Sequence, residues 1–264
     1  MIRHILIFLA IFLFVTHVYS QPKGVKYNIG PKIGVNLYKS RFNFKEDEKW
    51  FDQKTRIGFQ LGATLDMPLK EMIHFVGEFY YSHKGKKTLI TDSGLTNDAR
   101  YQFLELPVLL RFSFNGGKVS SGDFKWHLDL GPSISYWLSG KGSLYGNGPT
   151  SEYEIIFSET PPNVSDFNKM YISNVNRFQW GLIAGVGINY PIYRHQVVYV
   201  DLRIGFGGTN LGQHDTVANL NIIGFAESMS ARFLEFSLSA AYTFEVDWIQ
   251  TKRGKSTVTK RKKS

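Results

Sequence analysis

Few residues in this sequence have the type and spacing that catalysis requires. Ser82 and His83 are neighbours, and His214 and Asp215 are neighbours in a separate segment. A serine nucleophile needs a base within hydrogen-bond reach. Adjacent residues on a strand point to opposite faces, so Ser82 and His83 cannot pair directly. The sequence therefore predicts a protein that is not an enzyme, with a lipid-modifying enzyme that uses these histidines as the alternative.

Metal and cofactor sites are also not expected. The 264-residue chain has no cysteine, which removes thiolate ligands, thiol nucleophiles and disulfides together. Its seven histidines show no metal spacing, and the acidic run 46–48 lies between Lys45 and Lys49. Gly205-Phe206-Gly207-Gly208 is not followed by a helical pattern, as a phosphate loop would be.

Ionic residues recur instead on one side of segments that alternate between apolar and polar positions. This polar face combines glycines with charges of both signs, and Arg56 and Arg100 are counted among its cations. The candidate network comprises Lys32, Glu78, Glu105, Arg111, Asp129, Asp201, Arg203 and Glu235. Near-equal numbers of opposite charges predict that these side chains face one another.

Eight segments with a period of two must position these charges, and this period is typical of β-strands. The segments are 27–37, 55–67, 72–83, 100–114, 123–139, 177–190, 196–207 and 231–246. Their apolar faces include Leu128, Leu182 and Leu202. Several are longer than the roughly nine to eleven residues that a tilted strand needs to cross a bilayer.

The connections between these segments alternate in length. Residues 68–71, 115–122 and 191–195 form short links, with turns expected at 68–71, 115–117 and 191–195. The long links are 38–54, 84–99, 140–176 and 208–230. An up-and-down transmembrane barrel has short periplasmic turns and long external loops, so we expect both termini in the periplasm.

The apolar face must be buried against something, and lipid is the only candidate that is large enough. We therefore predict an all-β fold, an eight-stranded antiparallel up-and-down transmembrane β-barrel with lipid outside and charges inside. A barrel of eight strands is just wide enough for side chains to fill. We expect a layer of Lys32, Glu78, Glu105, Asp129, Asp201 and Arg203 to close the lumen. A small-solute porin is the alternative.

Aromatic residues near the strand ends predict girdles at the two membrane interfaces. The candidates are Tyr27, Trp126, Tyr136, Trp180, Tyr190, Tyr242, Phe244 and Trp248. Ordinary sheet aromatics would explain some of them equally well.

The two ends of the chain differ from this pattern. Residues 1–20 have the charged, apolar and small-residue order of a secretory signal peptide, and the barrel is expected over 21–248. Residues 249–264 form a basic tail, expected to be disordered and periplasmic. It carries Lys252, Arg253, Lys255, Lys260, Arg261, Lys262 and Lys263. These seven supply most of the formal net charge of +9, so a nucleic-acid partner is not expected.

Residues 25–246 resemble the PorT-like outer-membrane β-barrel family. The resemblance rests on the motifs at 30–36, 77–85, 103–112, 131–132 and 241–244, and Glu105-Leu106-Pro107 is the most specific of them. The resemblance implies a bacterial outer-membrane location, and one branch of the family takes part in type IX protein secretion. The long link 140–176 and the basic tail depart from the pattern. We expect a structural or accessory role in the envelope, in contact with lipid, with loops 140–176 and 208–230 or the tail engaging a partner. An enzyme that modifies outer-membrane lipid at the rim is the alternative.

Overall fold

The computed structural model describes residues 26–42, 51–90, 94–120, 122–146, 148–158, 168–193, 195–212, 217–220 and 225–247. The expected signal peptide and basic tail lie outside these residues. Among the residues described, no helix has both the length and the apolar character needed to span a membrane.

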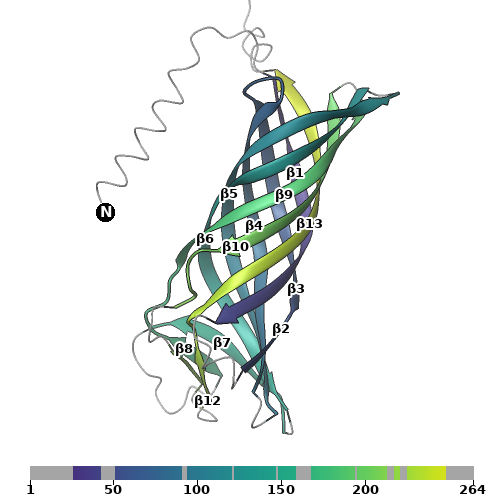
Figure 1. The fold of residues 1–264 in the computed structure, drawn as a ribbon. Coiled ribbons are helices and arrows are strands. Elements are labelled where there is room, and N and C mark those ends of the chain that lie inside the picture. Colours follow the sequence, from purple (N-terminus) through teal and green to yellow (C-terminus); the bar gives the residue numbers. More distant parts are fainter. Residues whose placement is uncertain are drawn as a thin grey trace, which may run out of the picture.

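Eight long strands form the body of the molecule (Figure 1). They are β1 (Lys26–Phe42), β3 (Arg56–Pro68), β4 (Ile73–Ile90), β5 (Thr96–Val119), β6 (Gly122–Tyr145), β9 (Phe178–Tyr193), β10 (Gln196–Gly207) and β13 (Ala231–Asp247). Each pairs antiparallel with the next along the chain, and β13 pairs with β1 to complete the ring. The predicted barrel fold is confirmed.

Five short strands continue the sheet at one end of the ring (Figure 1). They are β2 (Phe51–Lys54), β7 (Ser151–Phe157), β8 (Lys169–Ile172), β11 (Val217–Leu220) and β12 (Phe225–Ser228). We call this end the extension end. The opposite end, where β1 begins and β13 finishes, is the turn end.

Several predicted boundaries were wrong. The segment 84–99, expected to be a loop, is mostly strand, because β4 continues to Ile90 and pairs with the start of β5. Links 140–176 and 208–230 also contain strands, which take their hydrogen-bond partners from β6 and from one another. The turn expected at 115–117 is a register shift within the β5–β6 hairpin, with Gly117 at a φ of 138°.

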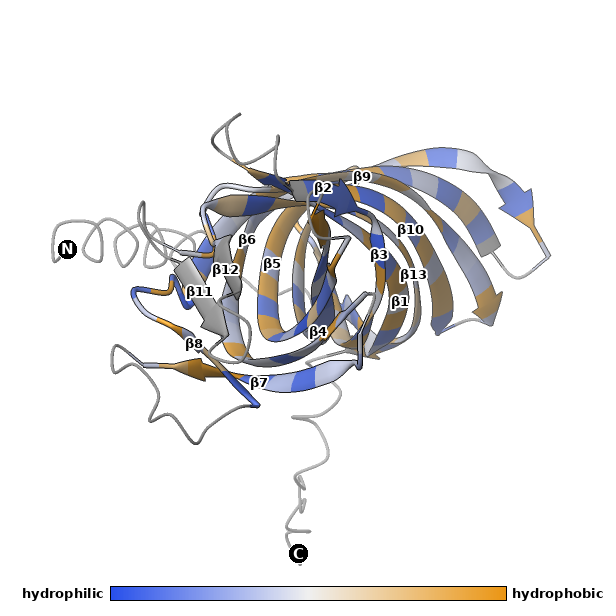
Figure 2. Ribbon diagram, turned by 90° about the horizontal axis from the view of Figure 1, so that it is seen from below, coloured by the Kyte–Doolittle hydropathy of each residue, from blue (hydrophilic) through white to orange (hydrophobic). Residues whose placement is uncertain are grey.

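The outer wall of the ring is apolar. Leu128, Leu182 and Leu202 point outward, with 40%, 51% and 57% of their surfaces exposed. Figure 2 shows hydrophobic and hydrophilic residues alternating along the long strands. Because successive side chains on a strand face opposite sides, the same alternation places the polar residues inside. The wall is therefore suited to acyl chains rather than to water.

Candidate functional site

The centre of the lumen is filled by buried ionic side chains from six strands. We call this group the ionic layer. It consists of Lys32, Asp66, Glu78, Arg111, His127, Asp129, Asp201 and Arg203. Each of these residues is at most 5% exposed. The side chains come from β1, β3, β4, β5, β6 and β10.

Lys32 and Arg203 connect opposite walls of the ring. Lys32 Nζ donates to Glu78 Oε1 at 2.7 Å and to Asp201 Oδ2 at 2.8 Å. Arg203 donates from Nη1 to Glu78 Oε2 at 2.7 Å and from Nη2 to Asp129 Oδ2 at 2.7 Å. Ionised groups in a low-dielectric interior need such partners, because an unpaired buried charge costs several kcal/mol, roughly.

Arg111 completes the layer through a forked contact. Its Nε and Nη2 donate to the two carboxylate oxygens of Asp129 at 2.8 and 2.9 Å. Its Nη1 reaches Asp66 Oδ2 at 3.2 Å, and Nη2 reaches Asp201 Oδ1 at 3.3 Å. A planar guanidinium matches this bidentate geometry, which a lysine ammonium cannot reproduce.

Strand β9 leaves room for the layer instead of contributing to it. A Cβ on Gly187 would lie 2.5 Å from His127 Nε2, and a Cβ on Gly185 would overlap the Arg203 side chain. Both glycines are on the inward face of β9, where they oppose Asp201 and Arg203. The glycines on β9 therefore leave the space that the large ionic side chains of the other strands fill.

Glu105 and Glu235, expected to belong to the same network, lie in the lumen closer to the extension end. Lys84 Nζ contacts Glu105 Oε2 at 2.9 Å and Glu235 Oε2 at 3.9 Å. Ser82 also donates to Glu105. The expectation that Glu105 belongs to the layer with Lys32 was therefore wrong. Glu105 is paired with Tyr80 on β4, and its carboxylate contacts Ser82 and Lys84 on the extension side of Tyr80. Lys84 was missed because the third strand was expected to end at residue 83.

An aromatic cluster fills the lumen beyond Lys84, and the sequence did not lead us to expect it. We call it the aromatic layer, and it consists of Tyr38, Tyr101, Phe103, Trp137 and Phe233. Trp137 is fully buried and stacks on Phe103 at a ring-centroid distance of 5.8 Å. Lys84 Nζ lies 5.0 Å from the Phe103 ring centroid. The signal for this layer was present in the sequence, because aromatic residues occupy inward positions at these strand ends.

Segments of the extension pack onto the aromatic layer at the open end of the ring. Met170 and Ile172 on β8, Leu211, and Met229 next to β13 are each at most 2% exposed within the same cluster. Parts of the segments 140–176 and 208–230 therefore cover the mouth of the barrel.

The predicted girdle residues lie on the outer wall at two levels. Tyr27, Trp126, Tyr190, Tyr242 and Phe244 lie toward the turn end, and Tyr136 and Trp180 lie toward the extension end. Trp126 is 42% exposed and stacks on Phe114 at 4.2 Å. Trp248 and the basic residues from Lys252 to Lys263 lie outside the described residues.

The candidate catalytic pair is split by the strand. Ser82 is buried and faces the lumen, whereas His83 faces outward, with its Nε2 2.8 Å from the hydroxyl of Tyr81. His214 and Asp215 lie outside the described residues. Among the described residues, Ser82 and His83 therefore form hydrogen bonds with other partners and not with each other.

One group in the ionic layer has donor atoms that could hold a metal ion. Ligand atoms of His127, Asp129 and Asp201 lie within 4.8 Å of one another. However, Arg111 and Arg203 already donate to both carboxylates, and His127 Nε2 lies 2.8 Å from Asp201 Oδ1. The guanidinium groups occupy the positions that a cation would need, so these residues fit an ion-pair network better than a metal site.

The chain is similar to one family of known proteins and to several solved structures. A family model described as an outer membrane protein beta-barrel domain matches residues 19–211. No curated protein matches the chain. Solved structures with similarity include OprG from Pseudomonas aeruginosa, at 11% identity and a TM-score of 0.46, covering 85% of this chain and 97% of that one. They also include Ail from Yersinia pestis, at 13% identity and a TM-score of 0.35, covering 84% of this chain and 99% of that one.

Proposed function

This chain belongs to the outer membrane protein beta-barrel domain family, and from that premise we propose that it is a non-enzymatic barrel with a closed lumen. The family implies a bacterial outer-membrane location. In this proposal the protein acts by presenting its extension and its lipid-facing wall, as a structural or accessory component of the envelope.

The proposal rests on the two layers of side chains that fill the lumen. The ionic layer links opposite walls, and the aromatic layer with its cover from Met170 and Leu211 lies beyond it. A solute would have to displace both layers in order to pass. Single-channel recording in planar bilayers should therefore show no steady conductance, with a known porin measured in the same bilayers as the positive control. Steady, solute-sized conductance would contradict the closed lumen and favour the porin alternative.

We place the extension outside the cell and both termini in the periplasm. This orientation follows the usual asymmetry of outer-membrane barrels, whose longer connections are external. In the same proposal residues 1–20 are a signal peptide that is removed on export. The chain has no cysteine, so one introduced cysteine can be labelled specifically. E152C on the extension should react with a membrane-impermeant maleimide on intact cells, whereas K118C at the turn end should react only after the outer membrane is permeabilised. The reverse pattern would overturn the orientation.

We further propose that the chain belongs to the PorT-like branch and supports protein secretion of the type IX kind through a protein partner. The resemblance at Glu105-Leu106-Pro107 supports this assignment. The partner would engage the exposed parts of 140–176 and 208–230, or the basic tail. Crosslinking in native envelopes should capture the same partner with the full chain, and a chain truncated after Trp248 separates the tail from the loops. A secretion defect should accompany deletion of the protein. Normal secretion without it would remove the type IX assignment.

The lipid-modifying alternative has a direct test. The Ser82 and His83 side chains lie on opposite faces of β4, which supports the non-enzymatic proposal. Replacing His83 and His214 with alanine should leave the lipid composition of the envelope unchanged. A change in lipid A acylation that depends on either histidine would establish an enzyme.

A further inference from the structure

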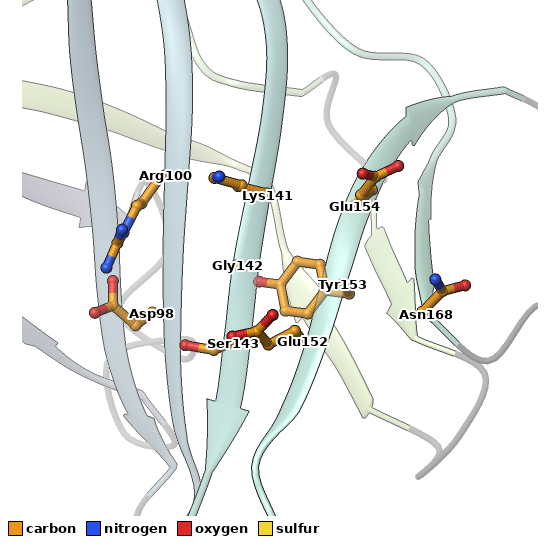
Figure 3. A pocket seen from close by; sticks show the side chains of 9 residues that line it. All are labelled: Asp98, Arg100, Lys141, Gly142, Ser143, Glu152, Tyr153, Glu154 and Asn168. Atoms are coloured by element: carbon orange, nitrogen blue, oxygen red, sulfur yellow. The ribbon is translucent and has the colours of Figure 1, made fainter.

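The outer face of the extension carries a polar pocket of about 350 Å³ that the closed-barrel proposal does not use (Figure 3). It lies across β5, β6 and β7. Its charged lining residues are Asp98 and Arg100 on β5, Lys141 on β6, and Glu152 and Glu154 on β7.

Strand register separates the two signs of charge within this pocket. Arg100 pairs with Lys141 across β5 and β6, and Lys141 pairs with Glu154 across β6 and β7. Figure 3 shows the Lys141 side chain directed toward the Arg100 side of the pocket, with Glu154 on the opposite side and Glu152 next to Ser143. The pocket therefore has a cationic half and a carboxylate half.

A neighbouring ion pair leaves the cationic half with an excess of positive charge. Arg56 forms an ion pair with Asp98, the acidic residue on β5 that lines this half of the pocket. A Cβ on Gly85 would overlap the Arg56 side chain, so the glycine lets that side chain cross β4. Arg100 and Lys141 are exposed, and in the part of the chain that the structure describes neither forms an ion pair. Glu152 and Glu154 are exposed as well.

The pocket also lies a short distance beyond the lipid-facing wall, past the level of Tyr136. Arg100 is four residues beyond the outward-facing Leu104 on β5, about 13 Å along the strand and about 9 Å along the membrane normal for a tilt of about 45°. A second cavity of about 180 Å³ joins Arg100 to the lipid-facing wall at Ile57 and Phe59. Ile57 and Phe59 are 70% and 47% exposed. A molecule with its head at Arg100 could therefore lay its chains on this wall.

We propose that this pocket binds the phosphorylated sugar headgroup of an outer-leaflet glycolipid of the lipid A type. The phosphate accepts hydrogen bonds from Arg100 and Lys141, since guanidinium and ammonium groups are the usual phosphate donors. The sugar hydroxyls donate to the Glu152 and Glu154 carboxylates, and the acyl chains lie on Ile57 and Phe59. The inference rests on the proposed orientation, which places the pocket at the outer leaflet.

The test uses the full chain folded in neutral detergent, with lipid A as the probe and lipid retention measured by native mass spectrometry. Lipid A without its phosphates, soluble glucosamine 1-phosphate and phosphatidylglycerol form the comparison arms. R100Q/K141Q replaces the charged phosphate donors with neutral amides, and E152Q/E154Q does the same for the charged sugar acceptors. K39Q/R232Q is the matched control, because it removes two exposed cations at the same end of the barrel from β1 and β13, across the ring from the pocket.

Wild type and K39Q/R232Q should retain lipid A equally, and R100Q/K141Q should bind it about tenfold or more weakly, as expected for lost charged hydrogen bonds. E152Q/E154Q should weaken lipid A but leave phosphatidylglycerol unchanged. Equal retention by R100Q/K141Q and wild type would overturn the site. Tighter lipid A binding by E152Q/E154Q, or equal binding of phosphatidylglycerol, would overturn the sugar assignment, and glucosamine 1-phosphate binding as tightly as lipid A would overturn the lipid source.

Failure of this inference can be distinguished from failure of the proposed function. Binding by the purified chain does not depend on orientation in the cell, whereas E152C labelling does. Lipid A retention with periplasmic labelling of E152C would therefore contradict the orientation but not the pocket chemistry. External labelling without lipid A retention would contradict only the pocket.

Discussion

Arg203 on β10 and Glu78 on β4 form a two-pronged ion pair across the lumen, with Nη1–Oε2 and Nη2–Oε1 distances of 2.7 and 3.0 Å. The two strands lie on opposite sides of the ring, and the two residues are 125 positions apart in the chain. This contact therefore joins walls that share no backbone hydrogen bonds. The stability of the barrel should depend on it more than on any ion pair at the surface.

Replacing Arg203 with methionine should lower the free energy of unfolding in detergent micelles by about 3–5 kcal/mol. It removes one of the three cations, with Lys32 and Arg111, that face the four buried carboxylates of the ionic layer. Urea titration followed by tryptophan fluorescence measures the change. The control is K26Q, since the Lys26–Glu245 pair is exposed, with side-chain exposures of 57% and 27%. K26Q should cost less than about 1 kcal/mol. Equal losses in both variants would mean that the ionic layer does not stabilise the fold.

The space beside Arg203 should be as important as its charge. G185A should destabilise the barrel by about 1–3 kcal/mol, because the added methyl group would overlap the Arg203 side chain. G205A is the matched control on the adjacent strand, since its Cβ would lie at an ordinary 3.4 Å from Glu235 Cβ. The same urea titration measures both. A G185A barrel as stable as G205A would show that Arg203 can move away at no cost.

Leu202 tests the lipid-facing assignment. It is 57% exposed, so in a protein surrounded by water an arginine at this position would be tolerated. In a bilayer, L202R should cost about 2–4 kcal/mol and L202A should cost much less. Refolding into phospholipid vesicles, followed by gel mobility of the folded form, compares them. Equal folding of L202R and L202A in vesicles would contradict burial of this wall in lipid.

Trp137 tests the cover over the barrel mouth. W137A should destabilise the protein by about 3–5 kcal/mol, because it removes a fully buried aromatic side chain from the aromatic layer. It should also expose the segment 140–176 to proteolysis, since Met170 and Ile172 pack into the same cluster. W180A, on the lipid-facing wall, should leave this segment protected. Unchanged protease resistance in W137A would mean that the extension is held by its strands alone.

The sequence determined the faces of the strands and their order in the barrel. Alternation along 123–139 and 196–207 placed Leu128 and Leu202 outside, because side-chain direction on a strand depends only on position parity. It also placed Asp129 and Asp201 inside. The lengths of the links indicated an up-and-down ring. These are local properties, so they can be read from a single chain.

Tertiary structure decided which charges meet. Lys32 and Asp201 are 169 positions apart, and their contact depends on how far each strand is shifted along its neighbour around the ring. The same shift placed Glu105 beside Lys84 instead of Lys32. The odd or even position of a residue along its strand determines which side of the sheet it faces, but not its height in the lumen.

One irregularity also changed a face. The register shift at Gln102/Phe103 inserts Leu138 as an extra residue in β6, so odd-numbered residues face the lumen up to Trp137 and face outward from Ser139 onward. Lys141 therefore lies on the outer face beside Arg100. Arg100 was expected in the lumen, but it shares the position parity of the outward-facing Leu104 and lies outside without any register shift. A one-residue slip reverses every side chain that follows it. The lipid-facing wall followed from the sequence alone, whereas the paired ionic layer and the external pocket required the registers that only the assembled ring sets.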